Sequence, residues 1–160
     1  MSQLISIVTP TFNEEENIEK LCSSIKEMMG KIKYDYEHIV IDNCSTDNTI
    51  KLLKNIASTD KKLKVILNSR NFGHIKSPVH GLCQASGDAI ILMMSDFQDT
   101  IDLIQQYIAE WEKGTKVIMA QKKTSDDNFL IHLTKKVLYK FIAKVSDTSL
   151  LINTTGSGLY

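Results

Sequence analysis

The chain has 160 residues, of which 42% are hydrophobic and 24% are charged. This is enough for one soluble globular domain with a hydrophobic core. The 19 basic and 19 acidic residues give a formal net charge of zero. This balance argues against a nucleic-acid partner, because domains that bind DNA or RNA usually carry a basic excess.

The cysteine spacing and the apolar runs indicate the cellular compartment of the protein. Cys22, Cys44 and Cys83 show no CxxC spacing, which favours reduced thiols in a cytosolic protein over a disulfide or a zinc site. No apolar stretch approaches the length of a membrane span, and the first ten residues lack the pattern of a signal peptide. A cytoplasmic protein is therefore expected.

The first half of the chain alternates short β-rich runs with segments of helical periodicity. The expected elements are, in chain order, a strand at 4–8, a helix at 14–29, a strand at 38–41, a helix at 49–57, a strand at 63–67 and a loop at 68–73. Asn13 precedes three glutamates and is the expected N-cap of the first helix.

The second half continues the same alternation. The expected elements are a helix at 75–85, a strand at 89–94, a helix at 101–111, a strand at 116–120, a helix at 129–145 and a small polar tail at 153–160. Pro78 is expected in the first turn of its helix, where a missing N–H costs nothing. Residues 89–94, AIILMM, form the most apolar run of the chain and predict a central strand.

Strands that alternate with helices predict an α/β fold with a mainly parallel, three-layer sheet. Ligands of such sheets bind at the carboxyl ends of the strands. Three polar segments stand at expected strand ends, at residues 9–14, 42–47 and 95–99. The sequence therefore predicts one site built from these three segments.

The segment at 95–99 carries residue types that can hold a metal. Asp96 and Gln98 are two positions apart, so in an extended segment they lie on the same side, and oxygen ligands at a strand end suit a hard divalent cation. Such a cation would clamp a diphosphate and neutralise a leaving group. The alternative is that Asp99 or Thr100 only caps the next helix.

The other polar segments also allow two interpretations. Asp42 and Asn43 can accept a hydrogen bond from a nucleobase, while Ser45 to Asp47 are natural caps for the following helix. Glu14 is the glutamate nearest to a strand end and can reach a ligand. Lys122 can meet phosphate as a point charge, or it belongs to a solvated loop.

Several nucleotide and hydrolase motifs are missing from the sequence. There is no GxxxxGK[ST] P-loop, no GxGxxG fingerprint and no GxSxG elbow. These absences weaken the interpretations as an ATPase, a dehydrogenase or a hydrolase.

Four motifs resemble, in order, those of family-2 glycosyltransferases of the GT-A type. IVTPTFNE at 7–14 resembles the opening strand and its P-x-[YF]-N-E turn, and IVIDNCSTDNT at 39–49 resembles V-D-[DN]-x-S-x-D-x-T. Residues 70–88 resemble the N-x-G…G…A-x-G-D stretch, and SDFQD at 95–99 stands where the family has D-x-D-x-Q-D. The match covers nearly the whole chain. It is closest to the branch with polyprenyl-phosphate acceptors, which includes enzymes like dolichyl-phosphate mannosyltransferase.

This resemblance implies a Rossmann-like GT-A fold that binds a nucleotide sugar. Residues that match the family's nucleotide pocket are Pro10, Phe12 and Glu14. Ile41 and Asn43 would contact the base, although many members have Asp where Asn43 stands, and Asn carries no charge.

The sugar-diphosphate end shows both matches and departures. Ser95 and Asp96 would lie against the nucleotide sugar, and Asp96 and Gln98 match the pair that binds Mg²⁺ or Mn²⁺. Met94 replaces the first Asp of D-x-D, so one carboxylate ligand is missing. Lys122 stands where relatives carry an arginine that faces phosphate, and a lysine lacks the bidentate fork.

The implied activity is that of an inverting glycosyltransferase. It would move a sugar from a UDP- or GDP-sugar to an acceptor such as polyprenyl phosphate, in the synthesis of surface polysaccharide or glycolipid. Asp96 and Asp99 are the candidate catalytic residues; a phosphate acceptor needs no base, whereas a hydroxyl acceptor would use Asp99. The alternatives are a non-catalytic nucleotide-binding or regulatory module, or a sugar nucleotidyltransferase, which would show a glycine-rich turn after the first strand.

Residues 155–160, TGSGLY, resemble a T-G-x-x-L-Y segment that lies inside family domains. Residues 1–160 are therefore expected to be the donor-binding part of a larger GT-A domain. Membrane association, at the cytoplasmic face, would come through parts outside this sequence.

Overall fold

The computed structural model describes residues 3–97, 99–121 and 154–160. The chain divides into two compact units, residues 1–118 with 156–160, and residues 119–155. The elements are β1 (Leu4–Thr11), α1 (Ile18–Gly30), β2 (Asp35–Asp42), α2 (Thr49–Thr59), β3 (Leu63–Leu67), α3 (Gly73–Cys83), β4 (Ala89–Leu92), α4 (Leu103–Glu112), β5 (Ile118–Gln121) and β6 (Thr154–Leu159).

The strands form one sheet in the order β3-β2-β1-β4-β6-β5. The first four strands are parallel, and β6 runs antiparallel to β4. β1 is central and pairs with β2 over its whole length, from Leu4 opposite Asp35 to Thr11 opposite Asp42. The carboxyl ends of β1, β2 and β4 therefore meet at one edge, which confirms the predicted α/β class and the parallel core of the sheet.

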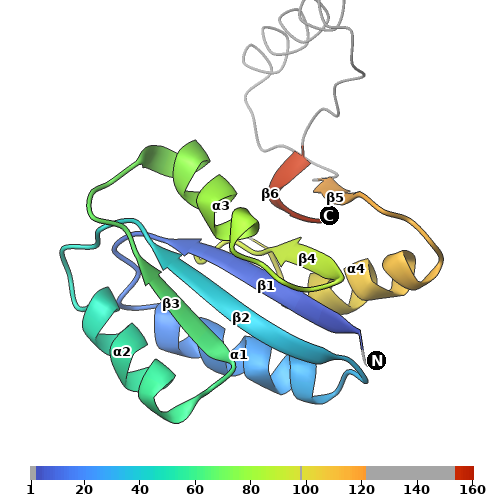
Figure 1. The fold of residues 1–160 in the computed structure, drawn as a ribbon, viewed down its shortest axis with the longest axis horizontal. Coiled ribbons are helices and arrows are strands. Elements are labelled where there is room, and N and C mark those ends of the chain that lie inside the picture. The colour runs from blue at the N-terminus through green and yellow to red at the C-terminus, as the bar shows by residue number, and fades with distance from the viewer. Residues whose placement is uncertain (1–2, 98, 122–153) are drawn as a thin grey trace, which may run out of the picture. The chain divides into compact units, whose positions relative to one another are not determined.

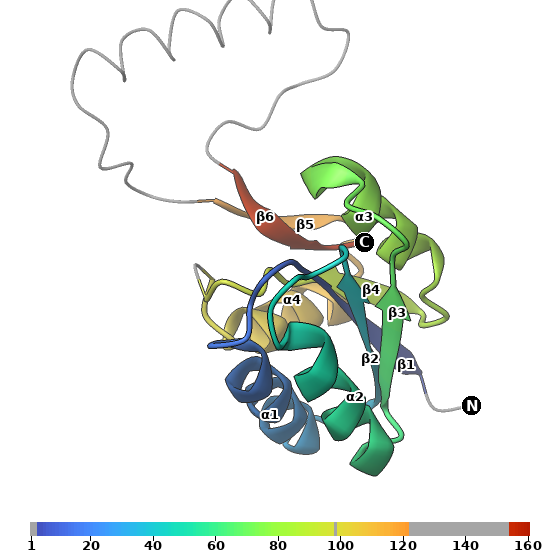
Figure 2. The same cartoon turned by 90° about the vertical axis from the view of Figure 1, so that its left-hand side faces the viewer.

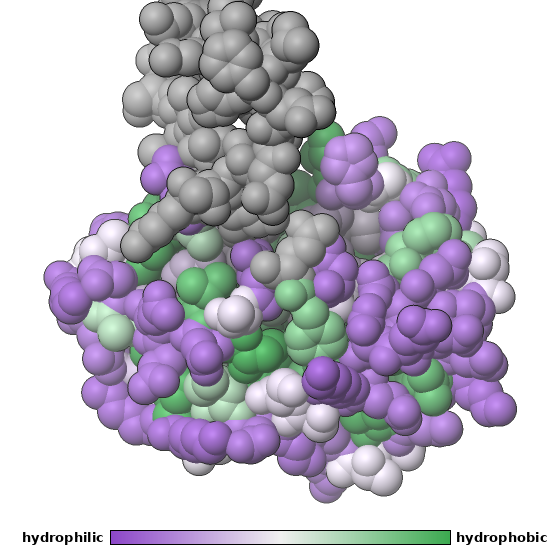
Figure 3. Space-filling model, turned by 180° about the vertical axis from the view of Figure 1, so that it is seen from behind, coloured by the Kyte–Doolittle hydropathy of each residue, from purple (hydrophilic) through white to green (hydrophobic). Residues whose placement is uncertain are grey.

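Helices cover both faces of the sheet. α1, α2 and α4 lie on one face, and α3 lies on the other (Figures 1 and 2). β1 and β2 are buried at almost every position, which is typical of parallel strands covered on both faces. Seen from behind the view of Figure 1, hydrophilic side chains dominate the rim of the molecule and hydrophobic ones gather toward the middle of that face (Figure 3).

α3 packs very closely on the sheet at Gly81. A Cβ atom there would lie 2.8 Å from Val8 Cγ1 and 3.0 Å from Ile41 Cγ2. The core on this face joins Val8, Ile39 and Leu92 from three adjacent strands. The close approach holds the C-terminal part of α3 directly against this face of the sheet.

Two local expectations are wrong, and the polar tail forms an element that its sequence did not predict. Asn13 does not cap the first helix: its φ is +54°, and α1 begins at Ile18 after Asn17. Pro78 lies inside α3, because this helix begins at Gly73 and so reaches Pro78 after its first turn. The polar tail forms β6, because it pairs with β4 through the backbone, with Tyr160 N donating to Ile90 O at 2.9 Å.

The expected helix at 129–145 lies outside the described residues. Within the parts that are described, no helix has the length and apolar character needed to cross a membrane.

Candidate functional site

A pocket of about 380 Å³ lies at the edge where β1, β2 and β4 end. Its lining comes from the three strand ends and the start of α3: Pro10, Thr11, Phe12, Glu14, Asn43, Asn71, Gly73, His74, Ser77, Pro78, Met94, Ser95 and Asp96. All three predicted segments contribute, so the fold brings them together at one pocket.

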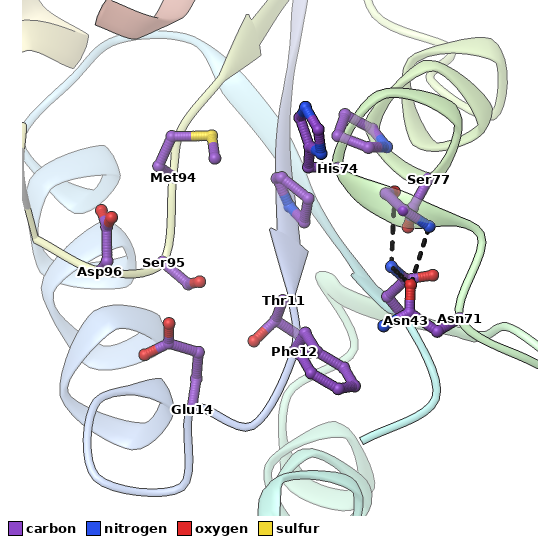
Figure 4. A pocket seen from close by; sticks show the side chains of 13 residues that line it. Thr11, Phe12, Glu14, Asn43, Asn71, His74, Ser77, Met94, Ser95 and Asp96 are labelled. Carbon is purple, nitrogen blue, oxygen red and sulfur yellow. Dashed lines mark hydrogen bonds between the residues drawn. The ribbon is translucent and has the colours of Figure 1, made fainter.

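The two sides of the pocket differ in chemistry. Ser95, Asp96 and Glu14 lie on one side of the end of β1, and Asn43, Asn71 and Ser77 lie on the other (Figure 4). Phe12 stands between them and is 43% exposed. An acidic side, a side of neutral amides and an exposed aromatic ring can hold the three unlike parts of a nucleotide.

The loops after β1 and β2 are tied together by hydrogen bonds. Asn13 N donates to Ser45 Oγ at 2.9 Å, and Thr46 N donates to Asn13 Oδ1 at 2.8 Å. The buried Asp42 carboxylate accepts from Ser45 N at 2.9 Å and from Ser45 Oγ at 2.5 Å. Asp42 thus orients Ser45, which in turn orients Asn13.

Backbone strain is concentrated around this pocket. Among the described residues, the non-glycine residues with positive φ are Asn13 at 54°, Cys44 at 69° and Phe97 at 54°. Each follows one of the three strands whose ends build the pocket. Such conformations cost about 1–3 kcal/mol each and cluster at functional sites, so their placement supports this pocket as the functional one.

The acidic side offers oxygen ligands. Asp96 is exposed, Ser95 is buried, and Glu14 Oε2 accepts from Asn17 Nδ2 at 2.8 Å, which holds its side chain. No cluster of three or more His, Cys, Asp or Glu suited to a metal occurs among the described residues, and a thioether such as that of Met94 is a poor ligand for Mg²⁺ or Mn²⁺. These residues fit a divalent cation that takes one or two carboxylates from the protein and the rest of its ligands from substrate phosphates.

Thr11 lines the pocket, although its sequence position alone indicates no role for it. Its side chain is 3% exposed, and its hydroxyl has no hydrogen-bond partner in the part of the chain that is described. Buried hydroxyls are normally satisfied, and this one belongs to the lining of the pocket. A bound ligand can supply the missing partner.

Three expected site residues, Ile41, Asp42 and Asp99, are buried and do not line the pocket. Ile41 and Asp42 are fully buried, and neither belongs to the pocket lining. Asp99 is 7% exposed, and its Oδ2 accepts from Ser157 Oγ of β6 at 2.5 Å. Asp99 is likewise absent from the lining.

Other expected site residues reach the pocket or fall outside the description. Pro10, Phe12, Glu14, Asn43, Ser95 and Asp96 line it. Gln98 and Lys122 lie outside the described residues. The lining also includes Asn71, His74 and Ser77. The resemblance covers the segment of Asn71 and His74 and implies no role for either residue. The fold brings both to the strand ends, together with the start of α3.

The family model of glycosyl transferase family 2 matches residues 6–160. The chain belongs to this family. Among curated relatives, this family-2 chain is 35% identical over 147 residues to CsbB of Bacillus subtilis (strain 168), which is named as a glycosyltransferase; the match covers 92% of the chain and 45% of CsbB. It is 34% identical over 143 residues to the bactoprenol glucosyl transferase of Shigella phage SfV, covering 89% of the chain and 47% of that protein.

A third relative carries a polyprenyl phosphate in its name. The undecaprenyl-phosphate 4-deoxy-4-formamido-L-arabinose transferase of Proteus mirabilis (strain HI4320) is 28% identical over 147 residues, which cover 91% of the chain and 45% of the relative. The family-2 chain thus spans about half the length of the curated relatives it matches.

Solved structures agree with the fold. S. aureus TarS 1-349 in complex with UDP-GlcNAc has a TM-score of 0.59 and 25% identity, over 78% of the chain and 36% of TarS 1-349. Glucosyl-3-phosphoglycerate synthase of Mycobacterium tuberculosis, solved with Mn²⁺, UDP and glucosyl-3-phosphoglycerate, has a TM-score of 0.68 and 21% identity, over 98% of the chain and 56% of the synthase. The second likeness concerns the fold alone.

Proposed function

We propose that this chain is the donor-binding part of an inverting glycosyltransferase that uses a UDP- or GDP-sugar. The observation that carries the proposal is the pocket itself, in which an acidic side, an exposed aromatic ring and an amide side meet at three strand ends. TarS, a structural relative, binds UDP-GlcNAc. Family membership and this pocket together favour a nucleotide sugar over other anionic ligands.

Each side of the pocket has a part of the donor to hold. The ring of Phe12 stacks on the base, since base–aromatic stacking tolerates any base. Pro10 and Glu14 flank this place, and the Thr11 hydroxyl hydrogen-bonds the bound nucleotide. On the acidic side, Ser95 and Asp96 lie against the sugar diphosphate, and Lys122 adds a positive charge for its phosphates.

A divalent cation, Mg²⁺ or Mn²⁺, is part of this proposal. Asp96 and Gln98 would hold it, with the phosphates of the donor as further ligands. When bound, the cation neutralises charge on the diphosphate as it leaves. Met94 contributes no charge, so the protein alone offers few ligands and the cation depends on the donor phosphates. We therefore expect metal and donor to bind together.

We further propose a polyprenyl phosphate as the acceptor, and a location at the cytoplasmic face of a membrane. A phosphate oxygen attacks the anomeric carbon from the side opposite the diphosphate; the new C–O bond forms as the old one breaks, and its electron pair leaves with the diphosphate. A phosphate acceptor is already anionic and needs no base. The burial of Asp99 and its bond to Ser157 support this choice, because a base for a hydroxyl acceptor must reach the pocket.

Calorimetry on the purified chain tests the donor site. UDP-glucose and GDP-mannose are titrated with Mn²⁺, with Mg²⁺ and with EDTA, against the native chain and Asp96→Asn. We expect at least one donor to bind only when metal is present, with affinity about tenfold or more lower in Asp96→Asn. If neither donor binds in the presence of metal, the proposal is refuted.

Transfer is tested with radiolabelled donor and undecaprenyl phosphate in detergent micelles. Sugar on the lipid, with the anomeric configuration inverted, supports the proposal. Metal-dependent binding without transfer or hydrolysis favours the non-catalytic module, for which Met94 in place of a carboxylate is the motivating observation.

A further inference from the structure

The amide side of the pocket is a closed network between two asparagines. Asn43 follows β2, and Asn71 lies just before α3. Asn43 Nδ2 donates to Asn71 Oδ1 at 2.9 Å and more weakly to Gly73 O at 3.4 Å. In return, Phe72 N donates to Asn43 Oδ1 at 2.9 Å and Gly73 N donates to Asn71 Oδ1 at 2.8 Å.

The backbone decides which way each amide faces. A backbone N–H can only donate, so the atoms that face Phe72 N and Gly73 N must be side-chain oxygens. The nitrogen of Asn43 then faces Asn71 Oδ1 and the carbonyl of Gly73, both of which are acceptors. A flipped amide at either position would place two donors against each other, so both orientations are determined.

Asn43 has no hydrogen-bonding capacity left for a ligand. Its oxygen accepts from Phe72 N and also from Asn68 Nδ2 at 3.2 Å, and both hydrogens of its nitrogen are directed at acceptors. An amide oxygen offers two lone pairs and an amide nitrogen offers two hydrogens. Asn43 therefore organises the loop and does not read a base.

Asn71 has one group left over. Its oxygen accepts from Asn43 Nδ2 and Gly73 N, while its Nδ2 makes no hydrogen bond within the described ranges 3–97, 99–121 and 154–160. The residue is exposed and belongs to the pocket lining beside Phe12. The amide side therefore presents N–H donors to the pocket, and neither amide presents an acceptor.

We infer that Asn71 reads the nucleobase of the donor, through a hydrogen bond from Nδ2 to a carbonyl oxygen or ring nitrogen of the base. This inference rests on the proposed function. It predicts that the chain recognises the acceptor groups of the base, which uracil and cytosine share at O2. The imino N–H of uracil, which cytosine lacks, finds no partner on either asparagine.

Replacing Asn71 by Asp turns the exposed hydrogen-bond donor of this side chain into an acceptor and leaves the loop intact. The Oδ1 atom of Asp still accepts from Asn43 Nδ2 and Gly73 N, and the exposed NH₂ becomes a carboxylate oxygen. Asn43→Asp, in contrast, places an oxygen against Asn71 Oδ1 and Gly73 O, which disrupts the loop. Asn55→Asp, at an exposed position of α2, is the matched charge control.

The test is calorimetric titration of UDP and CDP, each with Mn²⁺, into the native chain and the three variants. We expect Asn71→Asp to raise both dissociation constants about tenfold, because its carboxylate oxygen faces O2, an acceptor that uracil and cytosine share, and one well-placed base contact can carry a factor of that size. Asn55→Asp should leave both dissociation constants unchanged, and Asn43→Asp should weaken both nucleotides and also lower the thermal stability of the chain, because it disrupts the loop. Dissociation constants within twofold of native in Asn71→Asp overturn the inference.

Two further results keep the outcome unambiguous. Asn71→Ala should weaken both nucleotides about fivefold or more, since a ligand hydrogen bond is worth about 1 kcal/mol; unchanged affinities overturn the inference even if the Asp variant fails to fold. GDP with Mn²⁺ is titrated alongside, and if the native chain binds none of the three nucleotides, the proposed function itself fails. Binding by the native chain without an effect of Asn71 overturns this inference alone.

Discussion

The Ser157 hydroxyl donates a hydrogen bond of 2.5 Å to Asp99 Oδ2, across 58 residues of sequence. Ser157 is fully buried in β6, and Asp99 is 7% exposed in the segment that follows β4. Next to Ser157, a Cβ on Gly156 would lie 3.1 Å from the sulfur of Met94. β6 therefore packs against both ends of the segment from Met94 to Asp99, which carries the acidic side of the pocket.

Ser157→Ala is expected to lower the free energy of unfolding by about 1–3 kcal/mol, because it removes a partner of a buried carboxylate. Urea unfolding followed by circular dichroism measures the change. The control is Ser58→Ala, which loses an exposed hydrogen bond to Asn55 O within α2 and should cost less than about 0.5 kcal/mol. Equal effects of the two substitutions contradict this account of β6.

Gly81→Ala is expected to destabilise the chain by about 1–3 kcal/mol, since the added methyl overpacks the contact of α3 with the sheet. Val8 Cγ1 would lie only 2.8 Å from the new Cβ. Gly30→Ala is the matched control: it lies at the end of α1 with no atom within 4 Å of its Cβ position, and alanine there should be neutral or slightly stabilising. Thermal unfolding of both variants measures the two effects. A Gly81→Ala variant as stable as the native chain would mean that α3 can shift away from the sheet.

His38 should make stability depend on pH. Its side chain is buried in β2 and contacts Thr9 Oγ1 at 3.0 Å, and burial lowers the pKa of His38 from 6.5 to about 4, against a smaller opposing effect of Asp60. Between these two values the unfolded chain binds a proton that the folded chain does not. The free energy of unfolding should therefore fall as pH drops below 6.5, by about 2 kcal/mol at pH 5.

His38→Gln should flatten this part of the pH profile, whereas His80→Gln, an exposed histidine of α3, should leave it unchanged. Measurements above pH 5 distinguish the contribution of His38 to the pH dependence of stability from that of Glu37. Burial raises the pKa of Glu37, but hydrogen bonds from Lys64, Ser6 and Ser86 outweigh it and lower that pKa from 4.5 to about 2. The contribution of Glu37 is thus lost only as pH falls from 4.5 toward 2. An unaltered profile in His38→Gln would refute the assignment.

Met94→Asp tests whether the missing carboxylate limits metal binding. Met94 lines the pocket beside Ser95 and Asp96, so a carboxylate there adds charge and oxygen ligands. In the presence of UDP, we expect Mn²⁺ to bind about tenfold more tightly, because affinity for hard cations rises with the number of charged ligands. Met94→Leu keeps the apolar volume and should bind Mn²⁺ as the native chain does; calorimetry compares all three. Weaker binding by Met94→Asp would show that this position does not face the metal.

Local sequence patterns were enough to predict the alternation of strands and helices and the three segments that share the pocket. Hydrophobic periodicity is a local signal, and β1, β2 and β4 are apolar enough to be recognised without any partner. Once a parallel sheet is inferred, its topology alone brings the strand ends to one edge. The sequence therefore predicts that Pro10, Phe12, Glu14, Asn43 and Asp96 lie together, and all five line the pocket.

Tertiary contacts decided the rest. Asn13 looked like a helix cap, yet its backbone and side chain bond Ser45 and Thr46, more than thirty residues away. The TTGSGL segment has little strand propensity of its own and becomes β6 because β4 offers it an unpaired edge. Asn43 looked like a base-binding residue, but the loop before α3 uses all of its hydrogen bonds and leaves Asn71 facing the pocket. Which polar groups remain open to a ligand depends on partners distant in sequence, and only the folded chain brings those partners together.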